Sequence, residues 1–325
     1  MHSEFLTTKE GFVLARDARA AGLASSLAAA VSDGALERVR RGVYRAPLPS
    51  DPALSRPQRA ALRYRAQVMA APHTMRSPIF TSYSAAVIHG LPIIGEWPAE
   101  VYVMAPDRHG HRRRTAVSVA RIGEFAVASV DGVVVTSVEH TLIQLCRHAS
   151  LGAALVAVDA ALRAMPWETT TPSTTIERLT AEHERLRPYA GSRRTDAVLR
   201  RATSLADTPL ETCSRLVMEE FGVPEPTLQH RLWLPELGEW GYLDFYWPQF
   251  DAGGEADGDG KYLGGGSGAA SARTVVREKK RGAAARRRLR AFDRWDWPEM
   301  WARTPLVHRL RRLGLPVGAR RLRLF

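Results

Sequence analysis

One short stretch near the C-terminal end combines several carboxylates with a lysine. The strand-like run Leu243–Pro248 carries Asp244, and the next segment carries Glu255, Asp257 and Lys261. Carboxylate oxygens are the ligands that a divalent cation such as Mg²⁺ or Mn²⁺ prefers. A cation and an ammonium together neutralise the charge that builds on a phosphate under attack. The residue types and their spacing therefore predict metal-assisted hydrolysis of a phosphodiester.

Two other readings of these acids fit less well. The spacing from Glu255 to Gly260 is similar to the start of an EF-hand loop, but position 12 of that loop would be Gly266 rather than glutamate. A P-loop would require glycine in place of Glu255 and serine or threonine in place of Tyr262. The Gly/Ser/Ala-rich run over residues 263–272 is compatible with a mobile flap beside the site and equally with a disordered linker.

The net charge of +12 is concentrated at one end of the chain. Residues 273–325 contain 17 Lys and Arg against 4 Asp and Glu, whereas the first 272 residues contain 29 and 30. A single basic region points to a polyanion, most simply DNA. The candidate phosphate contacts in this region are Lys279, Lys280, Arg281, Arg287 and Arg288. An arginine-rich solubilising surface is the alternative.

The length indicates a multidomain protein, and the helix and strand patterns along the chain predict a mixed α/β fold. The 325 residues and 35.9 kDa are enough for two or three domains. No apolar run approaches the roughly 18 residues that a membrane span needs, and the N-terminus lacks the pattern of a signal peptide. Only Cys146 and Cys213 are present, which excludes a disulfide framework and favours the cytoplasm.

Residues 1–48 are predicted to form a winged helix-turn-helix domain. Thr7–Glu10 has the spacing of a capping box that opens a first helix, and Ala24–Ser32 is the expected recognition helix. Residues 36–45 alternate apolar and basic side chains around a glycine, as expected of a β-wing. The wing arginines Arg38, Arg40, Arg41 and Arg45 could hold phosphates. The second helix offers serine and alanine where base-reading side chains would be wanted, so a protein-docking wing is the alternative.

This N-terminal region resembles the winged-helix domain of the type IV abortive-infection (AbiE) antitoxins. The resemblance rests on Ala21–Leu23, Asp33–Leu36 and the element Arg40–Arg45. It implies a transcriptional regulator that binds DNA and has a nucleotidyltransferase-like toxin as its partner.

Residues 58–168 are predicted to form an α+β middle domain. The stretch Ser82–Ala161 resembles the second, toxin-neutralising region of the same antitoxins. His109 and His111 precede three arginines and could be read as a metal or phosphate loop. Without a third nearby ligand, an exposed basic turn between strands is the better interpretation.

Residues 195–325 are predicted to form a domain in the order helix, three strands, helix and strand. The expected segments are 209–218, 227–234, 241–247, the strand of Glu255, 274–292 and 294–297. This αβββαβ order and the residues Glu211, Gln229, Asp244, Glu255 and Arg294 resemble the PD-(D/E)XK restriction-endonuclease-like fold, near the very-short-patch-repair endonucleases. Trp295 and Trp297 are expected in the core rather than stacked on bases.

The resemblance implies roles for five side chains. Asp244 and Glu255 would be the primary ligands of Mg²⁺ or Mn²⁺, and Glu211 would add a ligand or orient a water molecule. Lys261 would stabilise the phosphate, with Asp257 as a further or alternative metal ligand. The sequence departs from the family at Asp257, where lysine is usual, so Lys261 must fold back into the site or Lys279 must replace it.

The sequence thus predicts a metal-dependent, endonuclease-like protein that acts on DNA in phage defence or a toxin–antitoxin system. The alternative is a non-catalytic antitoxin-like regulator that binds DNA and a toxin.

Overall fold

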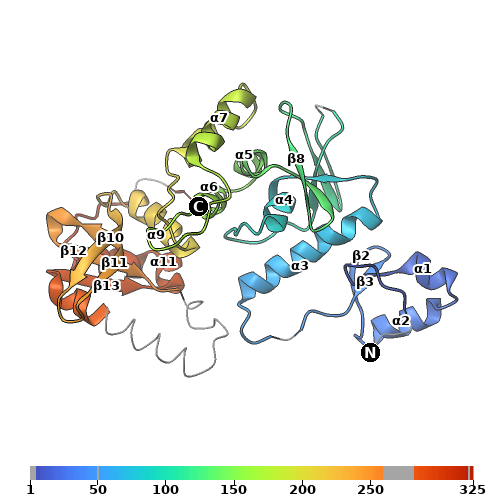
Figure 1. The fold of residues 1–325 in the computed structure, drawn as a ribbon, viewed down its shortest axis with the longest axis horizontal. Coiled ribbons are helices and arrows are strands. Elements are labelled where there is room, and N and C mark those ends of the chain that lie inside the picture. Colours follow the sequence, from blue (N-terminus) through green and yellow to red (C-terminus); the bar gives the residue numbers. More distant parts are fainter. Residues whose placement is uncertain (1–4, 50, 108, 259–281, 321–322, 325) are drawn as a thin grey trace. The chain divides into compact units, whose positions relative to one another are not determined.

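The computed structural model describes residues 5–49, 51–107, 109–258, 282–320 and 323–324 (Figure 1). The chain divides into two compact units. Unit 1 comprises residues 1–91, 96–145 and 184–189, and unit 2 comprises residues 92–95, 146–183 and 190–325. Several sheets and helices in both units make this a mixed α/β protein.

The N-terminal part of unit 1 contains two helices and a small sheet. Its elements are β1 (Val13–Leu14), α1 (Ala15–Ala20), α2 (Ala24–Ser32), β2 (Glu37–Arg40) and β3 (Val43–Arg45). The sheet order is β1-β3-β2, and β2 and β3 form the antiparallel hairpin that the sequence predicts as a wing. Phe5, Val13, Leu27 and Leu36 form its apolar core.

The first helix begins later than the capping-box pattern at Thr7–Glu10 predicts, so that prediction is wrong. Thr8 instead closes a turn, in which its Oγ1 accepts the N–H of Phe12 at 3.2 Å and its carbonyl accepts the N–H of Gly11 at 2.9 Å. A serine or threonine followed by glutamate three residues later also suits such turns, because the hydroxyl can bond to the nearby backbone in either conformation.

The remainder of unit 1 is built on a six-stranded sheet of order β6-β7-β5-β4-β9-β8. Its strands are β4 (Ile79–Phe80), β5 (Val101–Met104), β6 (His111–Arg113), β7 (Ala116–Val119), β8 (Val127–Val130) and β9 (Val133–Thr136). The helices in this part of the chain are α3 (Arg56–Ala70), the 3₁₀ turn η1 (Ala71–His73), α4 (Ser82–Ile88) and α5 (Val138–His148). Tyr64 of α3 packs in the core and shares a hydrogen bond of 2.8 Å with Ser84 of α4.

Unit 2 contains helices and a four-stranded sheet of order β10-β11-β12-β13. Its elements are α6 (Leu151–Leu162), α7 (Ile176–Leu186, which ends in unit 1), α8 (Ser192–Leu199), α9 (Pro209–Glu220), β10 (Thr227–Leu234), β11 (Glu239–Trp247), η2 (Pro248–Phe250), β12 (Ala252–Ala256), β13 (Ala291–Trp295), α11 (Trp297–Ala302) and α12 (Thr304–Arg312). Residues 282–288 are also helical. The neighbours β10–β11 and β11–β12 are antiparallel, whereas β12–β13 is parallel.

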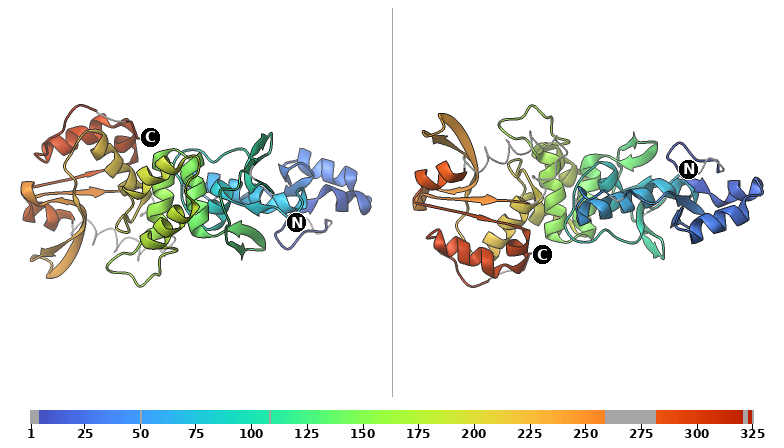
Figure 2. Two further views of the ribbon diagram at one scale, coloured as in Figure 1. Left: turned by 90° about the horizontal axis from the view of Figure 1, so that it is seen from above. Right: turned by 90° about the horizontal axis from the view of Figure 1, so that it is seen from below.

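Apolar clusters lie on both sides of this sheet. The larger cluster joins α9, α11 and α12 to Phe245, Trp247 and Trp295. The smaller cluster joins Ala284, Ala285 and Leu289 to Leu232, Leu234 and Leu243. Figure 2 shows the red helices α11 and α12 on one side of the orange strands and the helical residues 282–288 on the other. Helices on both faces bury the sheet and hold its strands in register.

Three boundaries differ from those expected from the sequence. The middle domain was expected to extend to residue 168, but α6 packs with α9 in unit 2. The basic helix was expected to reach Phe292, but its described part ends at 288 and Phe292 lies in β13. Trp297 was expected in a strand with Trp295, but it is the first residue of α11 and follows the helix cap Asp296.

Candidate metal and phosphate site

Asp244 lies where β11 and β12 diverge. The two strands pair from Trp247 back to Phe245, which pairs with Gly254, and the pairing stops there. Beyond it, the Asp244 carboxylate replaces the backbone as the acceptor, and its Oδ2 receives the N–H of Ala256 at 2.8 Å. Residues two apart on a strand normally share a face, yet Leu243 and Phe245 belong to different apolar clusters. The strand is therefore distorted at Asp244.

The strand opposite is distorted at the same point. Gln229 of β10 faces Asp244 in the ladder between the pairs Leu228–Phe245 and His230–Leu243, and its backbone has φ = 47°. A non-glycine residue in this region of the Ramachandran plot is strained by about 1–3 kcal/mol, and such strain is concentrated at functional sites. The Gln229 side chain is buried and its Nε2 donates to Glu211 Oε2 at 2.9 Å.

Glu211 lies in the first turn of α9 and is only 2% exposed. Its carboxylate also accepts the N–H of Asp207 and the hydroxyl of the helix cap Thr208, both at 2.9 Å. The positive end of the helix dipole favours an anion in this position. Burial, followed by the negative charge of Asp244, nevertheless raises the Glu211 pKa to about 8. The negative charge of Asp244 therefore contributes to the raised pKa of Glu211.

The raised pKa predicts a stability that falls with pH. Because the pKa of Glu211 rises from 4.5 on folding, the folded chain keeps a proton that the unfolded chain has released between about pH 4.5 and 8. This group thus favours folding at low pH, and its contribution is lost as the pH rises through that window, by up to about 1.4 kcal/mol per unit. Urea unfolding in EDTA from acidic to mildly alkaline pH should show this decline, and Glu211→Gln should flatten it. An unchanged slope in the variant would contradict the assignment.

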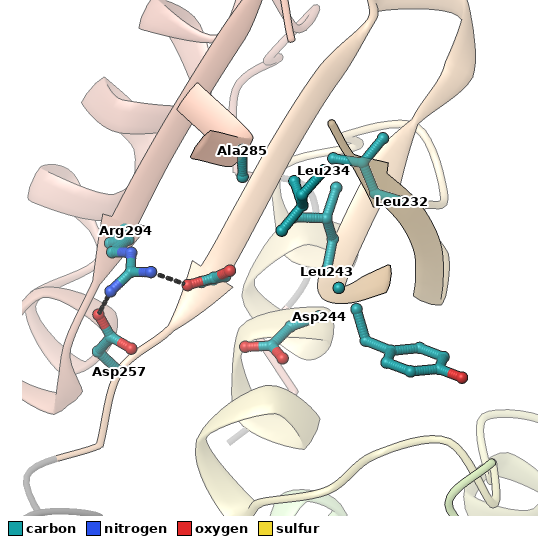
Figure 3. Close-up of a pocket in the computed structure, with 10 residues that line it drawn as sticks. Leu232, Leu234, Leu243, Asp244, Asp257, Ala285 and Arg294 are labelled. Atoms are coloured by element: carbon teal, nitrogen blue, oxygen red, sulfur yellow. Dashed lines mark hydrogen bonds and ion pairs between the residues drawn. The ribbon is translucent and has the colours of Figure 1, made fainter. Parts of the chain in front are cut away.

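Glu255 and Arg294 are neighbours across the parallel pair β12–β13. The Arg294 guanidinium forms ion pairs with Glu255 Oε2 and, at 3.1 Å, with Asp257 Oδ2. Figure 3 shows a dashed line from the Arg294 guanidinium to Asp257, with Asp244 in the same pocket. The pocket has a volume of about 110 Å³ and is lined by Leu232, Leu234, Gly241, Tyr242, Leu243, Asp244, Glu255, Asp257, Ala285 and Arg294. The structure thus brings Asp244, Glu255 and Asp257 to one pocket.

The donor set fits a divalent cation with water in part of its coordination shell. Three carboxylates and one guanidinium leave this part of the pocket negatively charged, and carboxylate oxygens suit Mg²⁺. Among the described residues, no three acids of this site have carboxylate oxygens that all lie within 4.8 Å of one another. Mg²⁺ is commonly held by one or two carboxylates with several waters, so a metal site in this pocket would use Asp244 and Glu255 as its ligands. Arg294 pairs with both Glu255 and Asp257.

The sequence did not indicate what two side chains of the site, Arg294 and Gln229, would contact. Arg294 of β13 places a positive charge beside Glu255 and Asp257, and the Gln229 side chain donates a hydrogen bond to Glu211. The contact of Arg294 with Glu255 could have been found only from the parallel register of β12 and β13, which the sequence between them does not fix. Lys261, Lys279, Lys280 and Arg281, which were predicted to act at phosphates, lie outside the described residues.

The described part of the basic helix presents its arginines to solvent. Ala284, Ala285 and Leu289 are buried, whereas Arg287 and Arg288 are exposed. Arg287 pairs with Glu236 through its Nε at 2.7 Å. The described part of this helix therefore has one apolar face and one basic face.

The wing arginines divide into two kinds. Arg45 pairs with Glu37 at 2.7 Å, and Arg40 packs near Thr74, where burial lowers the pKa of its guanidinium. Arg38 and Arg41 are exposed. The two exposed arginines are the better candidates for phosphate contacts. His109 and His111 are exposed, and His111 lies on strand β6, with its Nε2 3.2 Å from Ser118 Oγ.

Helices α1 and α2 with the hairpin β2–β3 fit the winged-helix class. Residues 4–47 match the protein family described as "Transcriptional regulator, AbiEi antitoxin". No curated protein matches the chain. Within the described residues, no helix is both long and apolar enough to cross a membrane.

Proposed function

We propose that unit 2 is a metal-dependent endonuclease that cleaves DNA, with the restriction-endonuclease-like αβββαβ fold. The observation that carries the proposal is the meeting of Asp244 and Glu255 at the divergence of β11 and β12, beside Arg294. The helix–strand order, the strain at Gln229 and the exposed arginines of residues 282–290 support it. The AbiEi match over residues 4–47 supports a role in a toxin–antitoxin system or phage defence.

The chain's own residues would divide the work of hydrolysis. Bound Mg²⁺ or Mn²⁺ would supply Lewis-acid polarisation of the phosphate and a lowered pKa for an attacking water. Asp244 and Glu255 would hold it, and the Ala256 N–H fixes the direction of the Asp244 carboxylate. Glu211, held by Gln229 and Thr208, would orient a water. The water oxygen bonds to phosphorus, one phosphorus–oxygen ester bond breaks, and the leaving oxygen takes its electron pair and a proton.

Metal dependence tests this proposal directly. Full-length protein is expected to nick supercoiled plasmid with Mg²⁺ or Mn²⁺ and to stop in EDTA. Calorimetric titration with Mn²⁺ is expected to show binding that Glu255→Gln weakens by at least about tenfold, because a neutral amide is a poorer ligand than a carboxylate. A wild-type protein that binds DNA but neither binds Mn²⁺ nor cleaves would refute the endonuclease proposal.

A second candidate function is a transcriptional regulator of the antitoxin type, which would bind DNA through residues 1–48 and a nucleotidyltransferase-like toxin as partner. The family match and the exposed wing arginines favour it. It does not require the carboxylates of unit 2. DNA binding that persists in the full-length Glu255→Gln protein, together with a wild-type protein that never cleaves, would favour this function over the first.

Arg38 and Arg41 of the wing are expected to contact DNA phosphates. Because both are exposed, Arg38→Gln with Arg41→Gln is expected to weaken binding to the DNA upstream of the protein's own gene by about tenfold at low salt, and to reduce the salt dependence of the affinity. Gel-shift titrations at several salt concentrations measure both effects. The matched control is Arg193→Gln, an exposed arginine of α8, which should leave the affinity unchanged. Equal affinities for the wing variant and wild type would point to a protein-docking wing.

A further inference from the structure

Arg294 is held on three sides at the entrance of the carboxylate pocket. Its guanidinium pairs with Glu255 through Nη2 and with Asp257 through Nη1 at 3.1 Å. The backbone N–H of Asp257 donates to the carbonyl of Trp295 at 2.9 Å, which fixes the end of this strand beside β13. The arginine side chain still keeps 26% of its surface exposed and lines the pocket.

The helical residues 282–288 form the third side. Gly282 lies against the guanidinium so closely that a Cβ atom on it would be 2.1 Å from Nη2 and 2.8 Å from Cζ of Arg294. No side chain fits there without displacing the guanidinium. The contact is therefore made by backbone alone, and a side chain at this position would have to push the guanidinium away.

We infer that Arg294 is a catalytic residue that contacts the scissile phosphate and stabilises its charge, with Asp257 as its positioning residue. The inference rests on the proposed endonuclease function. A guanidinium offers five N–H donors in a planar fork, so it can bind two carboxylates and still donate to a phosphate oxygen. Asp257 occupies the position where a lysine would be expected. It contributes to the stabilisation of the phosphate indirectly, because it orients the guanidinium of Arg294, which belongs to another strand.

The charge balance supports this arrangement. A carboxylate at position 257 without a partner would repel the phosphate, whereas the pair that it forms with Arg294 is neutral. Asp244 and Glu255 then supply the negative charge for a divalent cation, and the N–H groups of the guanidinium that do not bind the two carboxylates are donors for a phosphate oxygen. Glu255 of β12 and Arg294 of β13 are neighbours across the parallel strand pair, and they would thus provide a metal ligand and a guanidinium side by side.

The test compares single-turnover cleavage by full-length Arg294→Met, Arg294→Lys and Gly282→Ala proteins at saturating enzyme, with DNA affinity measured separately in Ca²⁺. Arg294→Met is expected to cleave about 10²–10³-fold more slowly, with its DNA affinity changed by less than about threefold. Arg294→Lys should recover part of the rate, because it restores the charge without the fork. Gly282→Ala should slow cleavage at least about tenfold without lowering the melting temperature, since alanine favours a helix.

Different results would contradict the endonuclease function and the catalytic role of Arg294. If wild type fails to cleave with any divalent cation, the endonuclease proposal falls. If wild type cleaves and Arg294→Met cleaves equally fast, only the role of Arg294 falls, and a loss of cleavage in Lys261→Met would then assign the cation to that lysine. Faster cleavage by Arg294→Met would also overturn the inference, because it would mean that the guanidinium withholds Glu255 from the metal. Arg193→Met, on α8, is the matched control and should cleave like wild type.

Discussion

Replacement of Asp244 by asparagine is expected to lower the rate of metal-dependent DNA cleavage by about 10³-fold. A catalytic metal ion typically contributes several kcal/mol to transition-state stabilisation, and a loss of about 4 kcal/mol corresponds to a rate change of this size. The asparagine Oδ1 can still accept the N–H of Ala256, so the strand junction should survive. The expected loss therefore arises from the missing negative charge and not from a changed fold.

The measurement is single-turnover cleavage of a plasmid by the full-length variant at saturating Mg²⁺. Glu225→Gln is the matched control, since Glu225 is an exposed carboxylate on the same unit. The control should retain wild-type activity. Asp244→Asn protein that nicks DNA at the wild-type rate would place the catalytic metal elsewhere.

The second large effect concerns stability. Trp295→Ala is expected to lower the free energy of unfolding of unit 2 by about 3–5 kcal/mol, as is usual when a buried tryptophan is truncated to alanine. Trp295 is 2% exposed, stacks on Phe245 with ring centroids 5.3 Å apart, and donates from Nε1 to Ser214 Oγ at 2.8 Å. Truncation would open a cavity and leave the buried Ser214 hydroxyl without this donor.

Urea unfolding followed by circular dichroism measures this effect, with the transitions of the two units fitted separately because multidomain chains need not unfold in one step. The control is Trp301→Ala, at a tryptophan that is 43% exposed and stacks on Trp297. It should cost less than about 1 kcal/mol. Similar losses in the two variants would mean that Trp295 is not part of a packed core.

The strand alternation and the element order of unit 2 could be predicted from the sequence because local patterns determine them. The run Leu243–Trp247 alternates buried apolar residues with polar or amphipathic ones, and Pro209 and Thr208 mark the start of α9. Trp295 was correctly expected in the core. At the N-terminus, the spacing of Arg38–Arg45 around a glycine indicated the hairpin β2–β3.

Features that depend on long-range packing could not be predicted. The pairing of Arg294 with Glu255 depends on a parallel register between two strands 35 residues or more apart in the chain. The positive φ of Gln229 has no signature in sequence, since glutamine rarely adopts it and the surrounding structure imposes it. The pattern at Thr7–Glu10 misled because the same residues suit a turn and a helix cap.

The packing of α6 determines where the chain can be divided. Asp159 of α6 is 1% exposed, and its carboxylate accepts from Thr212 at 2.8 Å and from Arg215 at 3.0 Å, both on α9. A fragment that started at residue 195 would remove this acceptor and strip apolar neighbours such as Val156 from α9. A fragment that contains the sheet of unit 2 should therefore start ahead of Ser150, the cap of α6. Proteolytic mapping that released a stable piece beginning near that serine would give the same boundary.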